Sequence, residues 1–98
     1  MKRETISPVV LALMQARANL EENWCQGCGQ GGQVCAVEAW WNQRIGVDAH
    51  EIGMCFLTEA LPFPRQSIIA FNDDKRTTKA DILALYDRAI ALALNDER

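Results

Sequence analysis

Residues 24–35 read Trp24-Cys25-Gln26-Gly27-Cys28-Gly29-Gln30-Gly31-Gly32-Gln33-Val34-Cys35, and this stretch decides how the rest of the chain is divided. It holds four of the six glycines and three of the four cysteines. So many glycines are typical of backbone that takes positive φ angles or approaches another group closely, and they end any preceding helix. We therefore predict an irregular loop here, with one helix before it and the remaining helices after it.

Apolar periodicity predicts a helix on each side of this loop. The first spans residues 8–23, where Ser7 can cap the helix and Pro8 suits its first turn. The second spans residues 34–44, with Gly46 just beyond its end. The inward side chains are expected to be Val10, Leu13, Met14, Ala16 and Leu20 in the first helix, and Val34, Val37, Trp40, Trp41 and Ile45 in the second.

A third helix is predicted over residues 49–61, capped by Asp48 and ended by Pro62 and Pro64. Residues 67–71 are interpreted as a single buried helical turn, because a lone strand would have no partner in this chain. The inward side chains of the third helix are expected to be Ile52, Cys55, Phe56 and Leu57.

The last helix is predicted over residues 79–94, where Thr78 and Asp81 resemble a capping box. Its inward stripe is expected to comprise Ile82, Leu85, Tyr86, Ala89, Ile90 and Ala93. The expected fold is therefore all-α: a compact, single-layer bundle of about four helices, forming one domain over residues 1–98.

Composition narrows the classes of partner. The net charge of the 98 residues is −3, and the basic residues are scattered, so nothing indicates a surface for nucleic acid. No apolar run is long enough to cross a bilayer. Lys2 and Arg3 precede an apolar stretch, but Gln15 interrupts it too early for a signal peptide. We expect a cytoplasmic protein whose cysteines are free thiols or metal ligands.

The cysteines allow a zinc site as the second interpretation. Cys25 and Cys28 have the C-x₂-C spacing that brings two sulfurs to one ion, and Cys35 and Cys55 could complete four ligands. The second pair lacks that spacing, so we expect no cofactor and interpret Cys35 and Cys55 as small buried apolar residues.

Two catalytic interpretations are weaker. Cys35 near a helix start and His50, the one histidine, could form a nucleophile and base, which would make a small Cys/His hydrolase. The glycines of residues 27–32 match G-x-G-x-x-G, but that motif should follow a strand rather than a helix. No catalytic set is therefore predicted.

Trp40 and Trp41 offer a candidate surface for binding another protein. Adjacent helical residues point about 100° apart, so one indole is expected in the core and the other partly exposed. An exposed tryptophan is typical of protein interfaces, although it can also lie over the rim of a core.

Several blocks resemble a family of small bacterial and bacteriophage proteins that is known only as a domain of unknown function. The blocks are Trp24-Cys25-Gln26-Gly27, Cys35-Ala36-Val37-Glu38-Ala39, Ile69-Ala70-Phe71-Asn72-Asp73 with Thr78, and Ile82–Ile90. The family pattern reads W-x-Q-G, C-x-x-G-A, F/W-N-D and R-T-x-x-E-V. This chain departs from it at Glu38, where the family has glycine, at Asp81, where it has glutamate, and at Arg76, one position early.

The resemblance implies no activity, but it singles out polar loop residues. Asn72 and Asp73 could satisfy backbone groups before the last helix, while Gln26 shapes the turn after the first. Alternatively, these three residues could converge on one polar pocket. Together, the sequence predicts a non-enzymatic protein-binding or regulatory module of phage or mobile-element type. Its expected partner is another protein, and a homo-oligomer is compatible with the sequence.

Overall fold

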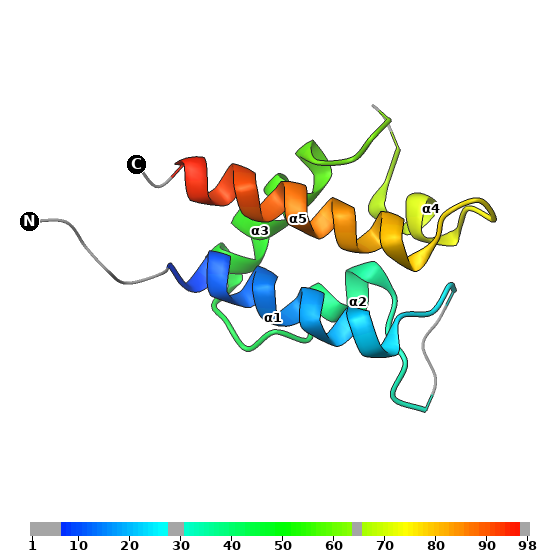
Figure 1. Ribbon diagram of the computed structural model, residues 1–98. Coiled ribbons are helices and arrows are strands. Elements are labelled where there is room, and N and C mark those ends of the chain that lie inside the picture. The colour runs from blue at the N-terminus through cyan, green and yellow to red at the C-terminus, as the bar shows by residue number, and fades with distance from the viewer. Residues whose placement is uncertain (1–6, 28–30, 64–65, 97–98) are drawn as a thin grey trace, which may run out of the picture.

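The computed structural model describes residues 7–27, 31–63 and 66–96, and these residues form five helices (Figure 1). The expected all-α class is confirmed. A fifth helix, α4, occupies the place where a single buried turn was predicted. The helices are α1 (Pro8–Asn23), α2 (Ala36–Trp41), α3 (Val47–Glu59), α4 (Ile68–Asp73) and α5 (Lys79–Asp96).

The two longest helices, α1 and α5, lie side by side and antiparallel (Figure 1). A two-pronged ion pair links them: Arg17 Nε and Nη2 lie 2.6 and 3.3 Å from the two carboxylate oxygens of Asp87. Further along the pair, Lys79 Nζ donates to the carbonyl oxygen of Glu21 at 2.7 Å. These contacts fix the register of α1 against α5, although exposed ion pairs of this kind add little stability.

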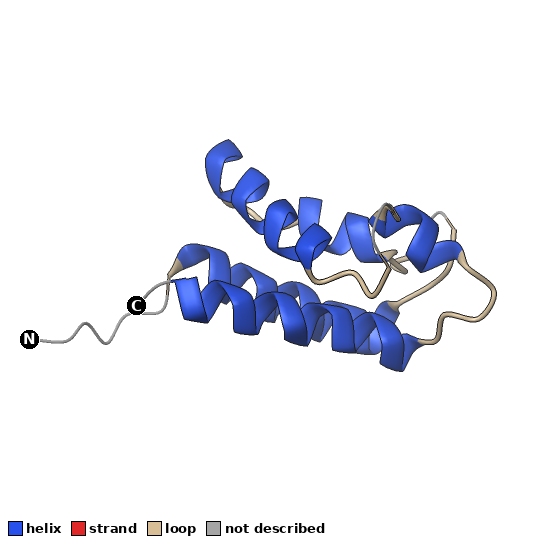
Figure 2. Cartoon of the chain, turned by 90° about the horizontal axis from the view of Figure 1, so that it is seen from above, coloured by secondary structure: helices blue, strands red, loops and turns tan. Residues whose placement is uncertain are grey.

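The three other helices pack on one side of this pair (Figure 2). Together the five helices enclose one apolar core. Tyr86 crosses this core, and its hydroxyl donates to the carbonyl oxygen of Ala36 at 2.7 Å. Burial raises the pKa of the Tyr86 phenol, which therefore stays protonated as a donor. The largest fully buried apolar side chains are Trp40, Tyr86, Leu13, Leu20, Leu57, Ile82, Leu85 and Val10.

Polar side chains start most of these helices. Ser7 caps α1 and Ser67 caps α4, each accepting from the backbone three residues ahead. The predicted capping box of α5 is confirmed: Asp81 N donates to Thr78 Oγ1, and Thr78 N donates to the Asp81 carboxylate. The predicted cap of α3 was wrong, because Gly46 is the N-cap and Asp48 lies within the first turn.

The second helix is shorter than predicted. Val34 pairs with Trp24 in an isolated parallel β-bridge, so its backbone is extended rather than helical. Cys35 then caps α2, with its sulfur accepting from Glu38 N and its own N–H donating to the Glu38 carboxylate. Helix α2 therefore begins at Ala36 and ends at Trp41.

Three residues that the sequence placed inside lie on the surface. Met14 of α1 and Ile52 and Cys55 of α3 were expected inside, yet all three are exposed. Leu57 is buried as predicted, and the buried residue of α3 that the sequence did not indicate is Gly53. A Cβ on Gly53 would overlap the indole of Trp40, so a residue without a side chain is what lets this ring pack against α3.

The glycine-rich loop has the backbone that its composition predicts. Gly27, Gly31 and Gly32 have φ angles of 72°, 60° and 92°, which only glycine adopts freely. The bridge between Trp24 and Val34 closes the loop at its base, through backbone hydrogen bonds of 2.9 Å on each side. The loop is thus anchored to the end of α1 and the start of α2.

Candidate functional site

Only one of the two candidate tryptophans lies on the surface. Trp40 is completely buried, and its indole N–H donates to the carbonyl oxygen of His50 at 2.9 Å. Trp41 is 47% exposed. The expectation that one indole lies in the core and the other is partly exposed is confirmed. Trp40, which was also named as a candidate for contact with a partner, is enclosed by the core and cannot make that contact.

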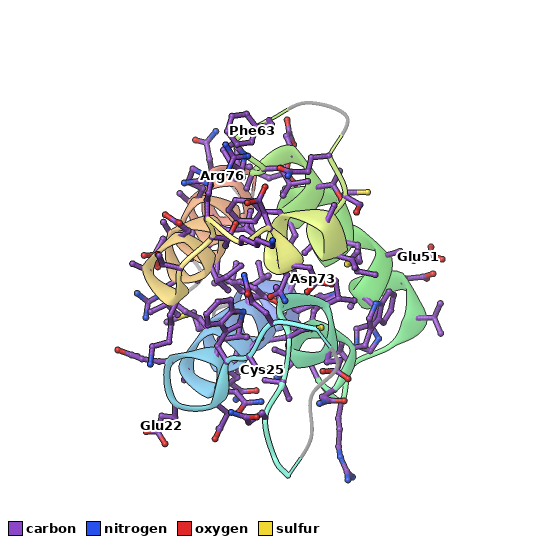
Figure 3. The ribbon with its side chains drawn as sticks, turned by 90° about the vertical axis from the view of Figure 1, so that its right-hand side faces the viewer. Glu22, Cys25, Glu51, Phe63, Asp73 and Arg76 are labelled. Carbon is purple, nitrogen blue, oxygen red and sulfur yellow. The ribbon has the colours of Figure 1, made fainter. Side chains whose placement is uncertain are left out.

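Trp41 is held in position by His50. The two ring centroids are 4.8 Å apart, and the imidazole also meets the edge of Trp40 at 5.6 Å. Val47 lies one helical turn before His50 on α3 and is 72% exposed. We name Trp41, Val47 and His50 the tryptophan surface; Glu51, the next residue of α3, extends outward beside it (Figure 3).

His50 packs against the exposed indole, and its own side-chain nitrogen is enclosed. Its Nε2 atom is shielded from solvent and has no hydrogen-bond partner among the described residues. An unpaired buried nitrogen costs free energy within the fold. The tryptophan surface therefore offers a partner the exposed side chains of Trp41 and Val47.

A second group of candidate residues forms a hydrogen-bonded junction between the glycine-rich loop and α4. Asn72 is completely buried. Its Oδ1 accepts from Trp24 Nε1 at 2.7 Å and from Ala36 N at 2.9 Å. Its Nδ2 donates to the carbonyl oxygen of Cys25 at 3.2 Å and to Asp73 at 3.0 Å. One side chain thus joins α4 to the end of α1, the loop and the start of α2.

Asp73 and Gln26 complete this polar junction, which we define as Gln26, Asn72 and Asp73. The Asp73 carboxylate accepts from Gly27 N at 2.7 Å. Gln26 Nε2 donates to the carbonyl oxygen of Asp74 at 2.6 Å. The hydrogen bonds from Asn72 and Gly27 lower the pKa of Asp73 below its ordinary value, because they stabilise the ionised form.

The structure brings the three predicted polar residues together, and their contacts are internal. A side-chain amide can accept two hydrogen bonds and donate two, and Asn72 uses all four within the chain. It has no capacity left for a ligand. The turn before α5 is satisfied by Asp74, not by Asn72 or Asp73: Arg76 N donates to the Asp74 carboxylate and Thr77 N to its carbonyl oxygen.

The cysteines are distributed over several elements. Cys25 and Cys35 each follow a residue of the parallel bridge between Trp24 and Val34, so they occupy corresponding positions on two neighbouring segments. Cys55, by contrast, is exposed on α3. The interpretation of Cys55 as a buried apolar residue was therefore wrong, and Cys35 is only partly buried. Cys28 lies outside the described residues. Within the described ranges no three His, Cys, Asp or Glu side chains gather closely enough to hold a metal ion.

Cys35 and His50 do not form the pair that a thiol hydrolase needs. Cys35 caps the start of α2, whereas His50 packs against the two tryptophans of its last turn. Burial raises the pKa of the Cys35 thiol, which disfavours the reactive thiolate. Both the placement and the direction of the pKa shift oppose nucleophilic catalysis by this pair.

Sequence reasoning missed two members of this region. It did not assign a partner to the Trp24 indole, and it did not single out Asp74 as the residue that organises the turn before α5. The available signal for Trp24 was its place in the W-x-Q-G block. For Asp74 it was the Asp–x–Arg spacing, which allows its carboxylate to meet the guanidinium of Arg76.

Comparison with known proteins gives one match. The model of a family of unknown function, DUF6197, matches residues 5–92, a range that contains both the tryptophan surface and the polar junction. The resemblance to a family of unknown function that the sequence indicated is thereby confirmed. No curated protein and no solved structure matches the chain. None of the described helices is long and apolar enough to span a membrane.

Proposed function

The chain belongs to the DUF6197 family, a family of unknown function, and on that premise we propose that it is a non-enzymatic module that binds another protein through the tryptophan surface. The observation that carries the proposal is the 47% exposure of Trp41 beside Val47, which is 72% exposed. Large exposed aromatic residues are enriched at protein interfaces, where tryptophan often contributes a large part of the binding free energy.

The packing of Trp41 favours a role in protein binding. Its ring packs against His50, and His50 packs in turn against the buried Trp40. A side chain that is already ordered loses less conformational entropy on binding than a free one. The binding free energy from burying the indole is therefore less offset by an ordering cost.

The test is partner capture with matched variants. Purified chain, Trp41→Ala and Leu94→Ala are immobilised and exposed to the same cell extract, and captured proteins are purified and their affinities measured. Leu94 is 50% exposed on α5, so it controls for loss of any exposed apolar side chain. We expect Trp41→Ala to weaken the affinity by at least about 30-fold, which corresponds to a hot-spot loss of about 2 kcal/mol.

The opposite pattern would reject the tryptophan surface. Equal affinities for the parent chain and Trp41→Ala, with circular dichroism showing both folded, would mean that the indole only covers the rim of the core. A loss confined to Leu94→Ala would place the contact on α5 instead.

A zinc-stabilised interaction domain is the second candidate, and one observation favours it. The bridge between Trp24 and Val34 holds Cys25 and Cys35 at corresponding positions on two neighbouring segments, so two thiolates could reach one ion. Elemental analysis of the tag-free protein tests this candidate. About one zinc per chain, lost in Cys25→Ser together with a lower melting temperature, would support it; zinc-free protein whose melting is unchanged by a chelator would reject it.

A further inference from the structure

Two hollows lie along one side of α5. The first has a volume of about 340 Å³ and the second about 620 Å³. Both are lined by Pro62 and Arg88, so they meet at these two residues. We name the two together the α5 groove. Figure 3 shows Phe63 and Arg76, which line the first hollow, close to each other and far from Glu51 beside the tryptophan surface.

One face of α5 forms the floor of this groove along most of the helix. Residues 81, 84, 88, 91 and 95 all line it, and their spacing of three or four places them on one helical stripe. Two of them, Ala84 and Ala91, are small and leave room above the helix. The fourteen steps from residue 81 to residue 95, at about 1.5 Å each, give a length of about 21 Å, which exceeds the length of most small ligands and suits a peptide.

The opposite wall is largely apolar and comes from residues 60–63, which follow α3, and from Phe71 of α4. Phe63 is 59% exposed, whereas Phe71 of α4 is almost buried and closes the base of the first hollow. In the second hollow, Leu61 faces the stripe of α5. Apolar walls over a floor of small residues provide surface that a partner's apolar side chains can bury.

Arg88 gives the groove a positive charge at its centre. Its Nε donates to the carbonyl oxygen of Ala60 at 2.8 Å, which fixes the stem, and no ion pair to Arg88 occurs among the described residues. By contrast, Arg76 is paired with Asp74. The terminal nitrogens of the Arg88 guanidinium are thus left to bind a carboxylate, for which their planar geometry is well suited.

Gln66 lines the first hollow, but its side-chain oxygen is not open to a ligand. Its Oε1 is shielded from solvent and has no hydrogen-bond partner within the described part of the chain. The groove therefore presents a partner with a central cation between two apolar hollows.

We propose that the α5 groove binds a peptide segment of a partner protein in which one acidic side chain, paired with Arg88, lies between two apolar side chains that fill the hollows. Asp81 lines the first hollow and Glu59 lines the second, so a positive charge beside either apolar side chain of the segment would be complementary to the groove. This inference rests on the proposed function only in that the partner is a protein, because the groove shares no residue with the tryptophan surface.

The experiment is a selection of random dodecapeptides on the full chain, followed by anisotropy titrations of labelled synthetic copies. The titrations use the parent chain, Arg88→Gln, Ala91→Trp, Ala18→Trp and Trp41→Ala. Ala91→Trp fills the second hollow, while Ala18→Trp places the same bulk on the exposed side of α1 as a matched control. An asparagine copy of each selected peptide replaces its acidic residue.

We expect the selected peptides to be enriched in Asp or Glu with apolar residues on both sides. Arg88→Gln and the asparagine copy should each weaken binding by about tenfold, the value of one charge-assisted hydrogen bond. Ala91→Trp should weaken it as well, whereas Ala18→Trp and Trp41→Ala should not. If Arg88→Gln does not fold, the asparagine copy and Ala91→Trp decide the question.

Several results would overturn the proposal. These are recovery of no peptide, peptides without acidic enrichment, and unchanged binding to Ala91→Trp. Binding lost in Trp41→Ala would mean that the peptides occupy the tryptophan surface, and self-association abolished by Arg88→Gln would identify a second copy of the chain as the occupant. Partner capture that does not depend on Trp41 rejects only the proposed function, so failure of either idea can be recognised separately.

Discussion

At the scale of single residues, Asn72 shows how a buried amide can organise a fold. Its four hydrogen bonds reach Trp24, Cys25, Ala36 and Asp73, and three of these residues lie far from it in sequence. A buried polar group that loses its partner costs free energy, so the same bonds that stabilise this junction also make it intolerant of change.

Asn72→Ala should therefore be strongly destabilising. The substitution leaves Trp24 Nε1, the backbone N–H of Ala36 and the carbonyl oxygen of Cys25 without their partner. Removal of the amide also leaves a cavity. For both reasons we expect a loss of about 2–4 kcal/mol in the free energy of unfolding, measured by urea denaturation. Asn42→Ala, at an exposed asparagine, is the control and should change the free energy by less than about 0.5 kcal/mol. Similar values for the two variants would contradict this role of Asn72.

The neighbouring carboxylate makes part of the stability depend on pH. Hydrogen bonds from Asn72 and Gly27 lower the pKa of Asp73 below its ordinary value of 3.8 in the folded state. Its contribution is therefore complete above the unfolded-state pKa and is lost as the pH falls through the lower, folded-state value. Because Asp73 is exposed, solvent screening keeps this contribution small.

Asp73→Asn tests this dependence, since asparagine keeps an acceptor for Gly27 N without the charge. At pH 7 we expect the variant to melt less than about 4 °C below the parent chain, as befits an exposed charge. The difference should shrink as the pH falls through the lowered folded-state pKa of Asp73, and melting curves recorded at decreasing pH measure it. A difference that stays constant with pH would show that Asp73 acts through shape alone.

At the scale of elements, Gly53 determines how α2 and α3 pack. Alanine is favoured over glycine in a helix by about 1 kcal/mol, so Gly53→Ala would stabilise an isolated α3. Here the added methyl group would overlap the Trp40 indole, and we expect a net destabilisation of about 1–3 kcal/mol. Trp40 would also shift against His50, so the fluorescence of the tryptophans should change.

The control for this prediction is Glu51→Ala, an exposed position two residues earlier on the same helix. It should alter the melting temperature of the protein only slightly. If Gly53→Ala raised the melting temperature, the close packing of Trp40 against α3 would not hold in solution.

The helices differ in how well their ends and inward faces could be predicted from the sequence. The capping residues and period of α1 and α5 predicted both helices closely, because their signals are local. Ile52 and Cys55 of α3 were wrongly placed inside because the orientation of this helix depends on Gly53 accommodating Trp40, a contact with another helix. The start of α2 was wrong because Val34 pairs with Trp24. The polar junction had its residues named from the family resemblance, but its partners across the chain could not be read from spacing.

At the scale of the whole molecule, one core joins two regions, and each region can be followed by a different spectroscopic signal. Helices α1 and α5 contain 16 and 18 residues and dominate the far-ultraviolet circular dichroism. The three tryptophans, by contrast, lie at the end of α1 and within α2. Tyr86 of α5 and Asn72 of α4 both bond to Ala36, so the two regions are tied at the start of α2.

This connection predicts that unfolding is a single cooperative transition. Circular dichroism and tryptophan fluorescence should give the same urea midpoint for the parent chain, as expected for a small domain with one core. Tyr86→Phe removes the bond to the Ala36 carbonyl oxygen and should lower both midpoints together, by about 1–2 kcal/mol in free energy of unfolding. A fluorescence midpoint that falls while the circular dichroism midpoint stays unchanged would mean that α2 and the glycine-rich loop unfold separately from the α1–α5 pair. In that case the tryptophan surface would be a locally mobile site, and partner binding would have to order it at a cost in affinity.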